Sequence, residues 1–138
     1  MRDDVTKIQE LKEEIRKFRD ARGWDDMKNP KDAALSLVLE AAELLEHFQW
    51  KTSDEVKKEK RLFGPIADEL ADVLWWVMVV ADAMGIDVAQ AFERKLTKNE
   101  KKYPAKAFQE AKTQAEKDRV YYRIKAKARG SHPLAEEE

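Results

Sequence analysis

The chain has 138 residues, the size of one ordinary domain, and its 27 Lys and Arg nearly balance its 28 Asp and Glu. This balance gives no general reason to expect attraction to nucleic acid or to a membrane surface. The absence of cysteine excludes disulfides, thiolate metal sites and thiol catalysis, and the low content of Gly and Pro (4 of each) favours long helices. The N-terminus is too polar for a signal peptide and no apolar run is long enough to span a bilayer, so we expect a cytoplasmic all-α domain.

Hydrophobic spacing and helix-ending residues divide the chain into predicted helices. Apolar residues recur every three or four positions over 5–18, which predicts an amphipathic helix that ends near Gly23. Asn29 and Pro30 are typical of a helix start, and the helix they open covers about 30–49. The remaining predicted helices cover 53–64, 65–83, 88–102 and 105–129. We expect these segments to form a bundle of four or five helices. Their apolar residues are more than one small bundle can cover, so we also expect a homo-oligomer, either a dimer or a tetramer.

The last predicted helix differs from the others in its charge. Between 105 and 129 it carries eight basic residues and only three acids, Glu110, Glu116 and Asp118. We interpret it as a solvated helix or an arm of an oligomer; a patch that binds phosphate or nucleic acid is the less favoured alternative. The sequence therefore divides into a domain at 1–104 and a charged C-terminal helix with a frayed tail at 105–138.

Two pairs of acids stand inside the most apolar helices. Glu40 and Glu43 are three residues apart in the second helix, and Glu69 and Asp72 repeat that spacing in the helix at 65–83. The neighbouring apolar residues indicate that these carboxylates point inward, where unpaired charges cost several kcal/mol and repel one another. Because these helices contain almost no Lys or Arg, a bound cation is the better way to neutralise them. A cage of oxygens suits Mg²⁺ above other ions.

Other kinds of site fit the sequence less well. The E-x-x-E spacing arises by chance in any charge-rich chain, so the signal lies in two such pairs within apolar helices. A di-iron bundle needs Glu-x-x-His on two helices, whereas His47 has the wrong spacing to Glu43 and Glu46. Zinc is disfavoured without Cys or a His pair, and no glycine-rich phosphate loop is present.

At these acids the chain resembles the MazG-like superfamily of all-α NTP pyrophosphohydrolases, especially its dCTP pyrophosphatase branch. The resemblance covers about 8–104. The matching segments are EAAELLEHFQW at 40–50, ELADVL at 69–74, the spacing Lys95-x-x-x-Asn99-x-x-Lys102-Tyr103-Pro104, and Arg22-x-Trp24 with Pro30. The family hallmark is E-x-x-E followed, after one to three dozen residues, by E-x-x-D.

The resemblance implies hydrolysis of a nucleoside triphosphate to the monophosphate and pyrophosphate with Mg²⁺, as house-cleaning of the nucleotide pool. By that analogy, Glu40, Glu43, Glu69 and Asp72 are the metal ligands, and one of them or Glu46 orients the attacking water. The analogous substrate contacts are Trp24, Trp50, Trp76, Lys95, Asn99, Lys102 and Tyr103. Trp24 and Trp50 are equally consistent with core packing, and the residues at 95–103 with an exposed helix face.

Two departures bear on the substrate. Trp76 stands where the dCTP enzymes are expected to have tyrosine, and Ile15 where they tend to have histidine. A pyrimidine deoxynucleotide, dCTP or a modified form, is therefore our first expectation for the substrate. Two rivals stay open: a non-catalytic helical module for protein interaction, and a regulator that binds nucleotides without cleaving them.

Overall fold

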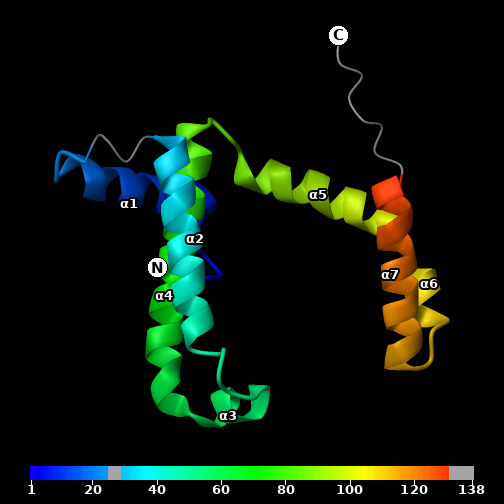
Figure 1. The fold of residues 1–138 in the computed structure, drawn as a ribbon. Helices are drawn as coiled ribbons and strands as arrows, with labels where there is room; N and C mark the ends of the chain where they lie inside the picture. Colours follow the sequence, from blue (N-terminus) through cyan, green and yellow to red (C-terminus); the bar gives the residue numbers. More distant parts are fainter. Residues whose placement is uncertain (25–28, 131–138) are drawn as a thin grey trace. The chain divides into compact units, whose positions relative to one another are not determined.

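The computed structural model describes residues 1–24 and 29–130, and within that part every regular element is a helix, which confirms the all-α class (Figure 1). The chain divides into two compact units, 1–89 and 90 onward, and each is described by itself. The first unit contains α1 (Ile8–Asp20), α2 (Pro30–Glu46), α3 (Ser53–Lys58), the 3-10 turn η2 (Lys60–Leu62) and α4 (Phe63–Ala83). The second contains α5 (Val88–Lys102), which begins just before the division, α6 (Ala105–Gln109) and α7 (Gln114–Gly130).

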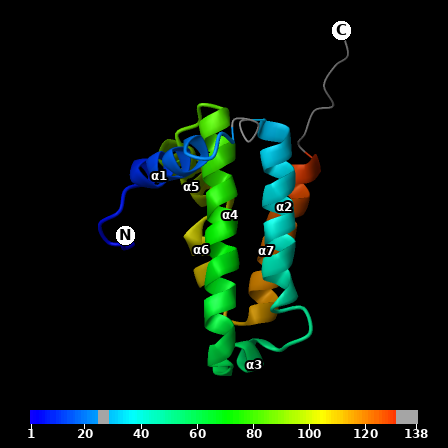
Figure 2. The ribbon, with the colours of Figure 1, turned by 90° about the vertical axis from the view of Figure 1, so that its left-hand side faces the viewer.

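Helix α4 is the centre of the first unit, with α1 and α2 on different sides of it (Figure 2). Its sequence is apolar around most of its circumference, so it can pack against a neighbour on each side. The buried core joins Ile15 of α1, Ala33 of α2, and Met78 and Val79 of α4. The acid pair of α4 and the acid pair of α2 are consequently carried by two helices that pack against each other.

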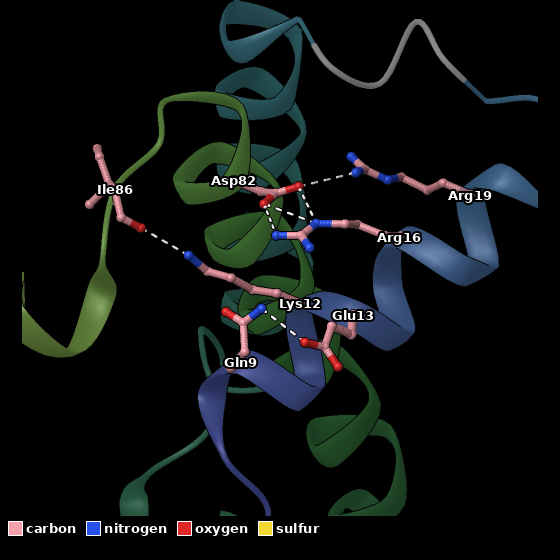
Figure 3. A network of polar contacts seen from close by, with 7 residues as sticks. All are labelled: Gln9, Lys12, Glu13, Arg16, Arg19, Asp82 and Ile86. Carbon is pink, nitrogen blue, oxygen red and sulfur yellow. Dashed lines mark hydrogen bonds and ion pairs between the residues drawn. The ribbon is translucent and has the colours of Figure 1, made fainter.

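Polar contacts hold α1 against the end of α4 (Figure 3). Arg16 donates from Nε and Nη2 to the carboxylate of Asp82, with a shortest distance of 2.6 Å, and a guanidinium nitrogen of Arg19 lies 3.6 Å from the same carboxylate. Lys12 Nζ donates to the backbone oxygen of Ile86 at 2.8 Å. The hydrogen bonds from Arg16 lower the pKa of Asp82, so this carboxylate is charged and neutralised where it stands.

Local capping explains where several helices begin and end. Asn29 Oδ1 accepts a hydrogen bond from the Lys31 N–H at 3.0 Å, which confirms the predicted start of α2 at Pro30. Gly23 and Gly85 have φ near +63° and +64°, the left-handed conformation in which glycine commonly ends a helix. Both positions agree with the predicted ends of the helices before them.

Several predicted helix boundaries are wrong, and the helix predicted at 53–64 ends at Lys58. Helix α4 begins at Phe63, before Pro65, because a proline in the first turn removes only an N–H that has no partner within the helix. The segment at 105–129 is two helices, α6 and α7, separated at 110–113. Thr113 and Glu116 exchange hydrogen bonds there, with Glu116 Oε2 accepting from the Thr113 N–H at 3.0 Å, and this capping box starts a new helix.

Much of the apolar surface of α2 lies outside the core. Leu35, Val38, Leu39 and Leu45 are each more than half exposed, because α2 contacts α4 through one face only. In the second unit Phe92 and Leu96 of α5 are exposed as well. Within the described residues, no helix combines the length and the apolar character needed to cross a bilayer.

Candidate active site

Three carboxylates from two helices converge in the first unit. Glu40 and Glu43 project from α2 and Glu69 from α4, and one oxygen of each lies within 4.8 Å of the others. The spacing of three residues places the first two on one face of α2, and the packing of α2 against α4 brings the third to them. Three of the four acids in the predicted cage are therefore adjacent in the structure.

Glu69 is the most perturbed member of this cluster. Its Oε2 is buried and has no hydrogen-bond partner among the described residues. Burial raises the pKa of its carboxyl, and the negative charges of Glu43, Asp72 and Glu40 raise it further, while His47 acts weakly in the opposite direction. A buried acceptor surrounded by like charges is the arrangement that a bound cation would relieve.

Trp76 contacts the cluster directly. Its indole Nε1 donates to Glu40 Oε1 at 3.3 Å, from a position seven residues after Glu69 on α4. This hydrogen bond fixes the orientation of one carboxylate and leaves its second oxygen available. The structure positions Trp76 to hold an acid. Its expected contact with the substrate stays a prediction.

Asp72 and Glu46 lie outside the group of three. Asp72 is exposed, although its charge contributes to the raised pKa of Glu69, and Glu46 is exposed at the end of α2. The interpretation that all four acids point inward is wrong for Glu43 and Asp72, which are both exposed. The reason is that the apolar neighbours of Glu43 on α2 are themselves exposed, so an apolar sequence did not mark a buried face.

The two other tryptophans predicted to contact substrate stand in different surroundings. Trp50 follows α2 and is 87% exposed, a ring without a packing role in the first unit. Trp24 follows α1, is 45% exposed and packs edge-on against Phe18 with ring centroids 5.8 Å apart. Core packing is thereby excluded for Trp50, whereas Trp24 is partly used in holding the end of α1.

The remaining predicted substrate residues belong to the second unit. Lys95, Asn99 and Lys102 lie on α5, and Tyr103 follows it directly. The Tyr103 ring stacks on Tyr121 of α7, with centroids 5.7 Å apart and an interplanar angle of 13°, and Lys102 Nζ lies 5.3 Å from the Tyr103 ring centre. These four residues lie within 95–103, in the second unit.

The chemistry of the donor set fits a hard divalent cation. The three clustered groups offer only carboxylate oxygens, and one of those oxygens is buried and unpaired. Within the described part of the chain no lysine or arginine forms an ion pair with Glu40, Glu43 or Glu69, so their charge is not neutralised by the protein. The donor set of the cluster is therefore of the kind that suits a hard divalent cation.

Sequence reasoning missed two features of this site. The bond from Trp76 to Glu40 had a signal, because Trp76 lies on the face of α4 that carries Glu69 and Asp72. His47 was considered only as a metal ligand, but its place four residues after Glu43 puts it on the same side of α2, within electrostatic range of Glu69.

The chain is similar in sequence to known proteins. The model of the MazG-like family matches residues 35–117, more than half of the chain. Human dCTP pyrophosphatase 1 is 34% identical over 91 residues, which cover 64% of this chain and 54% of the human protein. The mouse protein of the same name is 33% identical over 93 residues, covering 63% and 53%. The chain thus spans about half the length of the curated relatives it matches.

A solved structure extends the likeness to the fold. The crystal structure of a pyrophosphatase from Archaeoglobus fulgidus superimposes with a TM-score of 0.66 at 43% sequence identity, covering 70% of this chain and 92% of the archaeal one. The archaeal protein is thus matched over nearly its whole length. The predicted domain boundary at residue 104 coincides neither with the division after residue 89 nor with the end of the family match, and it stays a prediction.

Proposed function

The chain belongs to the MazG-like family, and from that premise we propose that it hydrolyses a nucleoside triphosphate to the monophosphate and pyrophosphate in the presence of Mg²⁺. The observation that carries the proposal is the uncompensated cluster of Glu40, Glu43 and Glu69, with oxygens within 4.8 Å of one another. The names of the relatives, dCTP pyrophosphatase 1 and pyrophosphatase, support the same reaction class. The proposed role is house-cleaning of the nucleotide pool.

Each acid has a defined part in this proposal. Glu40, Glu43 and Glu69 hold the metal, with Asp72 one turn further along α4 as the fourth ligand. When bound, Mg²⁺ neutralises phosphate oxygens and lowers the pKa of a bound water. Trp76 keeps Glu40 in place through its 3.3 Å hydrogen bond, and the unpaired Oε2 of Glu69 is available to ligate. Glu46, or a member of the cluster, orients the attacking water.

The proposed substrate is a pyrimidine deoxynucleotide such as dCTP or a modified form. Trp50, with its ring almost fully exposed, is the strongest candidate for stacking on the base, an interaction worth about 1–3 kcal/mol. Trp24, which is 45% exposed, is a second candidate. Lys95, Asn99, Lys102 and Tyr103 are proposed to contact the phosphates, because ammonium and amide groups suit phosphate oxygens.

A homo-oligomer, dimer or tetramer, is part of the proposal. The exposed side chains of Leu35, Val38, Leu39 and Leu45 on α2 leave an apolar face that a second copy would cover. An exposed face of this kind is typical of subunit interfaces. The proposed location is the cytoplasm, where nucleoside triphosphates are plentiful.

The test is a panel of canonical and modified dNTPs and NTPs with Mg²⁺, in which released pyrophosphate is scored separately from orthophosphate. We expect pyrophosphate from a pyrimidine deoxynucleotide and none when EDTA replaces Mg²⁺. Release of orthophosphate alone would contradict the reaction class. Tight nucleotide binding with no product at all would favour the regulator, and absence of both binding and turnover the interaction module.

A further inference from the structure

The second unit contains a pocket of its own. It has a volume of about 480 Å³ and lies between the end of α5, α6 and α7. Four of its lining residues are cationic, namely Lys101, Lys102, Arg123 and Lys127, and no acid lines it. Its floor is apolar and includes Val120 and Ile124 of α7. The volume is in the range of small-molecule sites.

The second unit is strongly basic, although the whole chain is nearly neutral. Residues 90–130 contain 13 Lys and Arg but only 5 Asp and Glu, whereas residues 1–89 contain 14 and 20. Lys101, Lys102 and Arg123 form no ion pair with a carboxylate anywhere in 1–24 or 29–130. Unpaired cations that share one pocket repel one another, and a bound anion relieves that repulsion.

We propose that this pocket binds a small nucleoside phosphate without a metal ion, with the phosphates on the cations and the base or sugar on the apolar floor. The Arg123 guanidinium offers a planar fork of donors to phosphate oxygens, and the lysines add positive charge. A compact pocket favours a single nucleotide over a nucleic acid, because single strands are bound along extended grooves. The pocket contains no carboxylate to hold a metal, so its chemistry differs from that of the proposed hydrolysis. Lys102 belongs to both proposals, and the test below therefore leaves it unchanged.

The test measures binding of dCTP to the full chain by calorimetry in EDTA. Without metal, the carboxylates of Glu40, Glu43 and Glu69 repel a triphosphate and no hydrolysis is expected, so the part of the binding that depends on Arg123 and Lys127 reports the pocket. The double variant Arg123→Gln, Lys127→Gln removes two cations from the pocket. The double variant Lys117→Gln, Lys125→Gln removes the same charge from α7 outside the pocket lining and is the matched control.

We expect the pocket variant to weaken dCTP binding about tenfold or more, and the control less than about threefold. The swap Arg123→Lys, Lys127→Arg keeps the charge and should retain most of the binding, which separates loss of charge from damage to the helix. All variants should keep Mg²⁺-dependent pyrophosphate release, so the two proposals fail independently of each other.

Three results would overturn the proposal. The first is no binding of dCTP to the wild-type chain in EDTA. The second is equal weakening in the pocket variant and the control, which would mean diffuse attraction by the whole unit. The third is preference for a single-stranded oligothymidylate of about 12 nucleotides through the same two residues, which would make the ligand a nucleic acid.

Discussion

Helix α4 carries an acid on each of two sides, and the two are treated in opposite ways. On the side facing α1, Asp82 receives two hydrogen-bonding nitrogens of Arg16 and the nearby charge of Arg19, and its pKa falls. On the side facing α2, Glu69 meets Glu40 and Glu43, has a buried unpaired oxygen, and its pKa rises. The charge of Asp82 is thus compensated by arginines, and this pairing stabilises the fold. The charge of Glu69 and its neighbours is uncompensated, which is the arrangement expected of a cation site.

The largest expected effect is on activity, from a variant in the uncompensated cluster of Glu40, Glu43 and Glu69. Glu43→Gln removes a proposed metal ligand and should lower the rate of pyrophosphate release about 10³-fold, because a bound metal supplies several kcal/mol of charge stabilisation in the transition state. The fold should be unaffected, since one of several repelling charges is removed. Asp32→Asn, an exposed acid in the first turn of the same helix, is the control and should leave the rate within about twofold.

Removing the compensated charge of Asp82 should instead lower the stability of the fold. Asp82→Asn leaves the buried Arg19 without its acid and should lower the free energy of unfolding by about 2 kcal/mol, as measured in urea. Part of the usual cost of breaking a buried pair is absent here because Arg16 is partly exposed. Asp68→Asn, an exposed acid of α4, is expected to change stability by less than about 0.5 kcal/mol. A larger loss of unfolding free energy in Asp68→Asn would contradict the expected difference between paired and unpaired acids of α4.

Trp76 donates a hydrogen bond to Glu40, one of the carboxylates in the uncompensated cluster. Trp76→Phe keeps most of the ring and removes the donor, which should weaken Mg²⁺ binding about fivefold, corresponding to about 1 kcal/mol. The rate at saturating Mg²⁺ should change little if the residue only positions Glu40. A raised KM for nucleotide at saturating Mg²⁺ would show that Trp76 contacts the substrate instead.

The smallest effects are two pH dependences of opposite sign, measured in EDTA. The pKa of Asp82 is lowered below its ordinary 3.8, so its contribution to stability is full above that value and is lost as the pH falls through the lowered pKa. The pKa of Glu69 is raised above its ordinary 4.5, so its contribution is present below that value and is lost as the pH rises through the raised pKa. Asp82→Asn and Glu69→Gln should therefore change the pH slope of stability in opposite directions.

The sequence predicted the positions of the helices better than the burial and long-range contacts of their side chains. The long helices and the starts of α2 and α5 follow from apolar spacing and capping residues, and the clustered Glu40, Glu43 and Glu69 follow from two acid pairs within apolar helices. The boundary between α6 and α7 also had a signal, the Thr113 and Glu116 capping box, which went unused.

Burial could not be predicted, because an apolar sequence does not reveal which face has a neighbour. On α2 apolar residues surround Glu43, and yet Glu43 and apolar neighbours such as Leu39 and Leu45 are exposed. The pairing of Asp82 with Arg16 and Arg19 depends on how α1 crosses α4, a long-range arrangement with no local pattern. The same limit applies to the pocket between α5 and α7, whose cations come from segments some 20 residues apart.

The most direct measurement is a calorimetric titration of Mg²⁺ into the wild-type chain and into Glu69→Gln, in the absence of nucleotide. If divalent binding relieves the uncompensated cluster, the wild type binds Mg²⁺ and the variant binds it at least about tenfold more weakly. Equal binding by both proteins, or none by the wild type, would contradict the account.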